Sequence, residues 1–134
     1  MKRIFSLLAV TASLVYFSSC EKDEGRLPNI SFKTGTGYVS SSMSIKKDSV
    51  FTVGITAAKT EDKDVLTTFT GTVSYNSGAD STLITETLTG SNGDNYTKDI
   101  AIRTHNAVGT EKYTFTVVNK DGLKNSISFV LSTN

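Results

Sequence analysis

Apolar and polar residues alternate along most of the chain from about Asn29 onward, which is the period of a half-buried β-strand. The clearest run places Phe51, Val53, Ile55 and Ala57 on one face. No stretch shows the 3.6-residue stripe of an amphipathic helix. The alternation predicts further strands around Ile30 and Phe32, Met43 and Ile45, Phe69, Val73 and Tyr75, Tyr96, Ile100 and Ile102, Tyr113, Phe115 and Val117, and Leu123, Ile127, Phe129 and Leu131. The pattern therefore favours an all-β fold.

Turn-forming segments separate these runs. Residues 59–64 form a charged loop, residues 76–78 a turn and residues 90–95 a longer turn, and the sequence Asn-Lys-Asp-Gly at 119–122 is the strongest hairpin signal. Gly71 leaves a gap in its apolar face and predicts a β-bulge. Residues 81–89 are ambiguous, because Leu83 is out of phase with Ile84 and Leu88. Seven or eight short strands, spaced by about 8 to 12 residues, predict an immunoglobulin-like antiparallel β-sandwich whose core includes Tyr75 and Tyr113.

The first twenty residues have the pattern of a targeting segment. Lys2 and Arg3 provide a positive start, and the uncharged residues 4–17 follow. As a helix this run is shorter than the roughly 30 Å hydrocarbon core of a bilayer, so it is not expected to remain as a membrane span. Small residues then precede Cys20, as a cleavage site requires. Residues 1–19 are therefore predicted to be a signal peptide.

The sequence Phe-Ser-Ser-Cys at 17–20 resembles the lipobox of bacterial lipoproteins. That resemblance implies that the Cys20 thiol carries a diacylglycerol and its amine a fatty acyl chain such as palmitate, which together anchor the protein in a membrane. The alternative is an ordinary secretory signal with an incidental cysteine. The residues that follow, Glu21 to Glu24, resemble the acidic export signal of Bacteroidetes surface lipoproteins. Lys22, Asp23 and Glu24 would then direct the protein to the outer membrane, facing the cell surface.

These observations predict three regions: a lipoprotein signal peptide at 1–19, a lipidated cysteine and flexible tether at 20–28, and an immunoglobulin-like domain at 29–134. Residues 113–122 resemble the closing hairpin of bacterial immunoglobulin-like domains, in which a Tyr-x-Phe-x-Val strand meets an Asp-Gly turn. This resemblance implies a fold and not an activity. The single cysteine excludes an internal disulfide, so packing alone must hold the core.

Residues that carry chemistry are few. His105, the single histidine, lies in a predicted loop without a nucleophile motif, so no catalytic residue, metal or cofactor is expected. Glu61, Asp62 and Asp64 alternate with lysines, which is typical of a solvated, internally neutralised loop, although a calcium site from Asp62, Asp64 and loop carbonyls stays open. A formal net charge of +1 without basic clusters argues against nucleic acid as a partner.

Three further residues are candidates for contact with carbohydrate. Tyr38 follows two loop glycines and could stack on a sugar ring, although most such tyrosines lie at the edge of a core. The sequences Asp-Ser-Val at 48–50 and Asp-Ser-Thr at 80–82 resemble an O-glycosylation motif of Bacteroidetes. The resemblance implies glycans on Ser49 and Ser81.

Together these features predict a non-enzymatic, lipid-anchored protein of the cell envelope that acts as a binding or assembly module. Its expected partners are the membrane, through Cys20, and an envelope protein or a glycan. Two alternatives remain open. One is an accessory glycan-capture lipoprotein of a polysaccharide-uptake system, and the other is a structural subunit that pairs through a strand edge.

Overall fold

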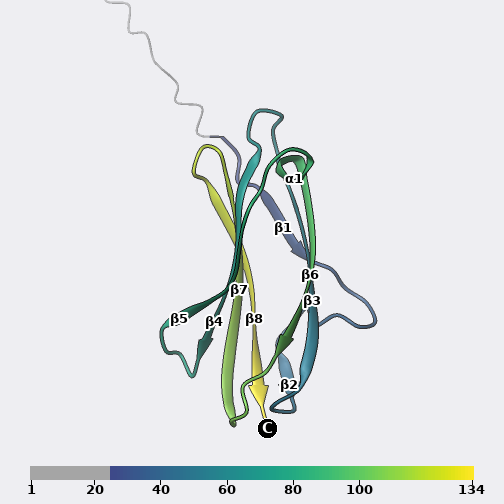
Figure 1. Cartoon of the computed structure of the whole chain (residues 1–134), viewed down its shortest axis with the longest axis vertical. Coiled ribbons are helices and arrows are strands. Elements are labelled where there is room, and N and C mark those ends of the chain that lie inside the picture. Colours follow the sequence, from purple (N-terminus) through teal and green to yellow (C-terminus); the bar gives the residue numbers. More distant parts are fainter. Residues whose placement is uncertain (1–24) are drawn as a thin grey trace, which may run out of the picture.

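The computed structural model describes residues 25–134, which form two β-sheets packed face to face (Figure 1). The prediction of an all-β, immunoglobulin-like sandwich is confirmed. Between residues 25 and 134 no helix is long and apolar enough to cross a membrane. The elements are β1 (Asn29–Phe32), β2 (Met43–Ile45), β3 (Val50–Ala58), β4 (Leu66–Tyr75), β5 (Asp80–Thr87), the one-turn helix α1 (Ser91–Asp94), β6 (Asn95–Arg103), β7 (Gly109–Asn119) and β8 (Lys124–Thr133).

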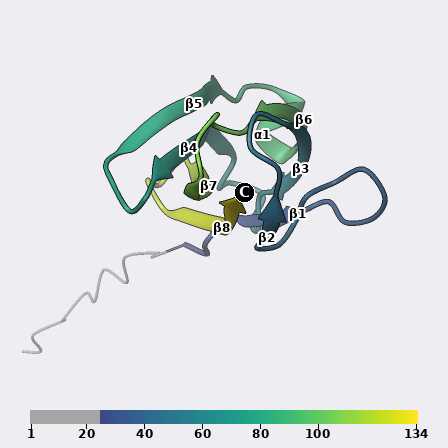
Figure 2. The same cartoon turned by 90° about the horizontal axis from the view of Figure 1, so that it is seen from below.

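The two sheets have the strand orders β1-β3-β6 and β2-β8-β7-β4-β5. Neighbouring strands are antiparallel, except that the short β2 runs parallel to β8. The sheets face each other in Figure 2, and the segment between β1 and β2 extends away from them. Strands β5 and β6 are the free edges on one side of the sandwich, and α1 lies on the connection between them.

The core lies between the two sheets and is rich in aromatic rings. Phe115 is fully buried, stacks on Phe69 at a centroid distance of 6.3 Å and meets Phe32 edge-on at 6.0 Å. Tyr113 is also buried, as predicted, and packs against Phe129. Aromatic rings from both sheets therefore pack against one another in the core.

The predicted bulge at Gly71 is present. Gly71 pairs with Ile84 while Thr72 pairs with Thr82, so Leu83 has no direct partner on β4 and is 38% exposed. Beyond this extra residue, the side chains of β5 that pointed inward point outward, and the reverse. This change explains why the apolar residues of 81–89 do not share one face. A Cβ on Gly71 would lie 2.9 Å from the Ile84 side chain, so the bulge brings that side chain over a position where only glycine fits.

One expectation about local structure is wrong. Tyr75 is not a core residue, because β4 ends there beyond the packed layer, and its ring is 38% exposed against His105. Within the predicted turn at 90–95, residues 91–94 form one helical turn, and the carboxylate of Asp94 pairs with Lys59 at 2.7 Å. That ion pair fastens the turn to the end of β3, and the hydrogen bond to Asp94 raises the pKa of Lys59.

The sandwich has two distinct ends along its long axis (Figure 1). The β3–β4 loop, the β7–β8 hairpin and α1 form one end, here called the proximal end. Gly25 lies at this end, beside Asp64 of the loop and Asp121 of the hairpin. The opposite or distal end carries the turn between β2 and β3 and the connection between β6 and β7.

Candidate binding surface at the distal end

A polar cleft of about 500 Å³ lies on the outer face of the five-stranded sheet, toward the distal end. Four of its residues are direct neighbours across the sheet: Val130 on β8 pairs with Lys112 on β7, which pairs with Ser74 on β4, which pairs with Asp80 on β5. The complete lining is Ser74, Ser77, Gly78, Asp80, Thr110, Lys112, Thr114 and Val130. The cleft is thus lined by hydroxyls with one cation and one anion, and it contains no aromatic side chain.

The β4–β5 turn forms one wall of the cleft and is held in a fixed position. Asn76 and Ser77 have positive φ angles of 48° and 60°, in the left-handed region. Asn76 donates its N–H to the Thr110 carbonyl at 2.8 Å and accepts the Thr110 N–H on Oδ1 at 2.9 Å. This reciprocal pair joins the turn to the start of β7, so the shape of the wall depends on Asn76.

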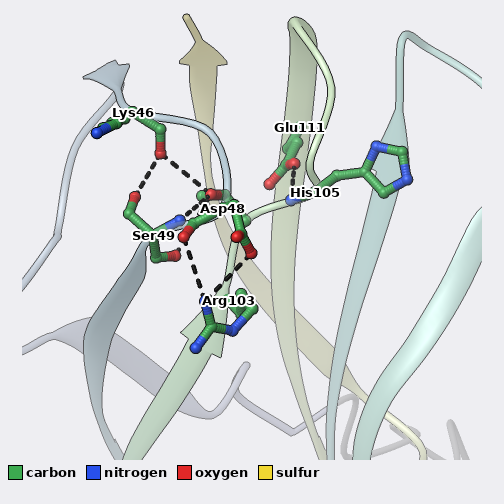
Figure 3. Close-up of polar contacts among 7 residues, drawn as sticks. Lys46, Asp48, Ser49, Arg103, His105 and Glu111 are labelled. Atoms are coloured by element: carbon green, nitrogen blue, oxygen red, sulfur yellow. Dashed lines mark hydrogen bonds and ion pairs between the residues drawn. The ribbon is translucent and has the colours of Figure 1, made fainter.

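The β2–β3 turn is fastened to the end of β6 by a polar network (Figure 3). The Thr104 hydroxyl accepts the Ser49 N–H at 3.0 Å and lies 3.2 Å from the Lys46 carbonyl. The Arg103 guanidinium donates to the carbonyl and the carboxylate of Asp48, at 3.2 and 3.1 Å. Asp48 itself has a φ of 54°, and these contacts hold it there.

His105 lies beside this network without forming a catalytic pair. Its main-chain N–H donates to Oε1 of buried Glu111 at 2.6 Å (Figure 3). Its ring packs on Tyr75 at a centroid distance of 5.1 Å. The Ser49 hydroxyl donates to the Lys46 carbonyl, so it is not oriented toward an imidazole. His105, Tyr75 and Glu111 line a small cavity of about 90 Å³ beneath the loop between β6 and β7. Their contacts position that loop.

Glu111 is a buried residue of this region that the alternation pattern did not indicate. It lies two residues before Tyr113, in phase with the buried face of β7, and it is 2% exposed. An acidic residue in phase with core positions is a usable signal, because a buried carboxylate must find hydrogen-bond donors.

Tyr38 lies on the outer face of the three-stranded sheet, where it is part of a charged cluster. Its hydroxyl donates to Oδ2 of Asp99 at 3.1 Å, and the Lys33 ammonium lies 5.8 Å from its ring centroid. Lys33 also pairs with Oδ1 of Asp99 at 2.7 Å, and this hydrogen bond raises the pKa of Lys33 and lowers that of Asp99. Tyr38 does not line the cleft, and its stacking on a sugar stays a prediction.

The remaining predicted residues are separated from one another. Ser49 is half-buried in the β2–β3 turn, whereas Ser81 is exposed near the start of β5, next to the cleft residue Asp80. Their glycosylation is an untested prediction. The predicted anchor and export residues, Cys20, Lys22, Asp23 and Glu24, lie outside the described residues.

The charged loop at 59–64 differs from the expectation of a uniformly solvated segment. Asp62 is exposed and lies 3.9 Å from Lys59, as a solvated loop residue would. Asp64, in contrast, is fully buried. Asp62 and Asp64 therefore do not share one environment, and within residues 25–134 no group of three or more His, Cys, Asp or Glu side chains is placed to hold a metal ion.

Two of the four edge strands, β5 and β6, bear on the strand-pairing alternative. The bulge at Leu83 interrupts β5, and β6 carries the charged side chains Lys98, Asp99 and Arg103. Bulges and charges are the usual devices that protect an edge from a further strand. The two edges are also linked, because Glu86 on β5 accepts hydrogen bonds from Tyr96 and Lys98 on β6, both at 2.6 Å.

Comparison with known proteins assigns the chain to no family. No protein-family model matches the chain, and no curated protein matches it either. The inference of function therefore depends on the chemistry and placement of the residues described above.

Proposed function

We propose that the protein is a non-enzymatic, lipid-anchored module of the bacterial outer membrane that faces the cell surface and binds another envelope component. In this proposal Cys20 is the anchor and Lys22, Asp23 and Glu24 form the export signal. The distal half of the sandwich, with its cleft, is the binding surface. The resemblance to a lipobox supports the anchor, and the placement of the cleft supports the direction of binding.

The observation that carries this proposal is the separation of the cleft from the point where the chain enters the domain. Gly25 lies beside Asp64 and Asp121 at the proximal end. The cleft is lined by the β4–β5 turn and the first residues of β7, and β7 begins at the distal end (Figure 1). Strand β4 has 10 residues, and a strand of that length spans about 33 Å. An anchor at Cys20 would thus leave the cleft facing away from the membrane, accessible to a partner.

A second candidate is the capture of a glycan in the same cleft. Hydroxyls from Ser74, Ser77, Thr110 and Thr114, together with Lys112 and Asp80, offer donors and acceptors of the kind that sugar hydroxyls pair with. The cleft has no aromatic platform, so recognition there would be through hydrogen bonds. Tyr38 would contribute only to a separate contact.

Anchoring and orientation are tested on intact cells. Labelling with a radioactive or clickable palmitate should mark the wild type and not a Cys20→Ala variant. Protease added outside should remove the domain from wild-type cells but not from an Asp23→Ala/Glu24→Ala variant, with a periplasmic protein as the control for leakage. Labelling of the Cys20→Ala variant would contradict the anchor, and protection of the wild type would place the domain in the periplasm.

Binding through the cleft is tested by cross-linking on living cells. A photo-cross-linking residue at Thr110, on the cleft, should capture a discrete partner, and one at exposed Thr97 on β6 should not. Lys112→Glu should abolish capture from position 110, whereas Lys124→Glu, at the other end of the molecule, should preserve it. Equal products from both cross-linker positions would contradict a distal binding surface. For the second candidate, a glycan array probed with the Cys20→Ala chain should give signals that Lys112→Glu removes.

A further inference from the structure

Two carboxylates that are far apart in the sequence meet at the proximal end. Asp64 closes the β3–β4 loop, and Asp121 lies in the turn between β7 and β8. The two segments are joined by a main-chain hydrogen bond from Lys120 to the Val65 carbonyl at 2.9 Å. A Cβ on Gly25 would lie 3.2 Å from Oδ2 of Asp64 and 3.3 Å from Oδ2 of Asp121, so both carboxylates face the same point on the chain.

Asp64 is buried without a hydrogen-bond partner. Asp64 is 0% exposed, and neither of its carboxylate oxygens accepts a hydrogen bond. Glu111, the other fully buried acid among residues 25–134, has a donor on each oxygen. A buried carboxylate without donors is strongly destabilising, because the charge loses its water and gains nothing in return. Asp64 therefore requires a positive partner or a proton.

A second acidic residue lies in the loop that carries Asp64. Glu61, in the same loop as Asp64, adds another buried oxygen without a partner, while its other oxygen lies 3.8 Å from Arg26 Nε. Two acidic residues of this loop therefore have buried carboxylate oxygens that no hydrogen-bond donor reaches.

We propose that Asp64 and Asp121 bind a calcium ion, which joins the β3–β4 loop and the β7–β8 hairpin at the point where the chain enters the domain. Calcium accepts six to eight oxygen ligands in flexible geometry, including main-chain carbonyls and water. Asp121 is exposed, so it gives the ion a path from solvent, and buried Asp64 supplies the dry side of the site. Asp62, the partner considered from the sequence, points instead to Lys59 and solvent.

The proposal is independent of the binding function, and its test is a thermal melt of the mature chain carrying Cys20→Ala, stripped with a chelator. Calcium at a hundredfold excess over its dissociation constant should raise the melting temperature by roughly 10 °C. Isothermal titration should give one ion per chain. Asp121→Asn should lose the shift, and because Asp121 is exposed this variant is expected to fold. Asp62→Asn is the matched control from the same loop and should keep the shift in full.

The other outcomes overturn the proposal. In one such outcome calcium leaves the melting temperature unchanged, and Asp121→Asn raises the melting temperature of the apoprotein at neutral pH. Asp64 and Asp121 would then share a proton and not bind an ion. If Asp121→Asn retains the calcium shift, the ion binds elsewhere. An equal shift with magnesium would overturn the assignment to calcium.

Discussion

The Tyr113 hydroxyl donates a hydrogen bond to Oε2 of Glu111, two residues earlier on β7, and both side chains are buried. The other oxygen of Glu111 accepts the main-chain N–H of His105 at 2.6 Å. Burial, followed by the hydrogen bond to Glu111, raises the pKa of Tyr113, so the phenol remains a donor at neutral pH. The pair thereby fastens β7 to the loop that follows β6, at the distal end.

We expect Tyr113→Phe to lower the free energy of unfolding by about 1 to 3 kcal/mol, because one buried oxygen of Glu111 then has no donor. Urea unfolding followed by circular dichroism measures the change. Tyr75→Phe is the matched control, since it removes the same hydroxyl from a ring that is 38% exposed, and its effect should be near zero. Equal losses in the two variants would contradict a special role for the buried pair.

The sequence pattern predicts the core strands well because each apolar residue in phase on β3 and β7 is buried between the sheets. Phe51, Val53 and Ile55 are all buried, as are Tyr113 and Phe115. The pattern fails at β5, where one unpaired residue, Leu83, reverses the alternation. A bulge depends on the pairing of two strands, so the sequence of β5 alone leaves its register undetermined.

Sites that are formed by residues far apart in the sequence could not be predicted from the alternation pattern either, because they also depend on how the strands pair. The contact of Asp64 with Asp121 depends on the position of the β7–β8 hairpin beside the β3–β4 loop, and the cleft depends on the order of four strands. In the sequence Asp64 has only charged and polar neighbours on its N-terminal side, which is typical of a solvated loop. Asp64 is nevertheless buried, because the order of the strands places the β7–β8 hairpin beside the β3–β4 loop.

Gly54→Ala should destabilise the domain by roughly 1 to 3 kcal/mol through overpacking. A Cβ at this position would lie 2.7 Å from Cβ of Lys33 and 2.8 Å from Cε1 of Tyr38. Chemical denaturation gives the change in stability. Adding Tyr38→Ala to Gly54→Ala should recover part of the loss, because one of the two clashes is then removed. A Gly54→Ala chain as stable as the wild type would show that Lys33 and Tyr38 are free to move away from β3.

Glu86 should make stability depend on pH in the acidic range. Lys98, and then Tyr96, lower the pKa of Glu86 in the folded state. A lowered folded pKa gives stability that is complete above the unfolded value near 4.5 and is lost as the pH falls through the folded value. Glu86→Gln should therefore cost roughly 0.5 to 1.5 kcal/mol at pH 7, a difference that shrinks below about pH 4.

Unfolding free energies measured from pH 7 to pH 3 test this expectation. Asp80→Asn serves as the control, because Asp80 is exposed on the same strand, and its difference from the wild type should stay small throughout. A Glu86→Gln difference that grows as the pH falls would have the wrong sign and would contradict the assignment.

Thr104→Val should destabilise the distal end by about 1 to 3 kcal/mol. The Thr104 side chain is buried, and its hydroxyl accepts the Ser49 N–H at 3.0 Å while lying 3.2 Å from the Lys46 carbonyl. Valine keeps the shape and removes these contacts, so the Ser49 N–H is left without its acceptor. Thr104→Ser is the matched variant, since it retains the hydroxyl and should recover most of the stability.

Hydrogen exchange locates the effect. The Ser49 amide should exchange faster in Thr104→Val than in Thr104→Ser, while the Val53 amide on β3 follows global unfolding. Equal exchange at Ser49 in the two variants would mean that the turn is held by Arg103 and Asp48 and not by the buried hydroxyl.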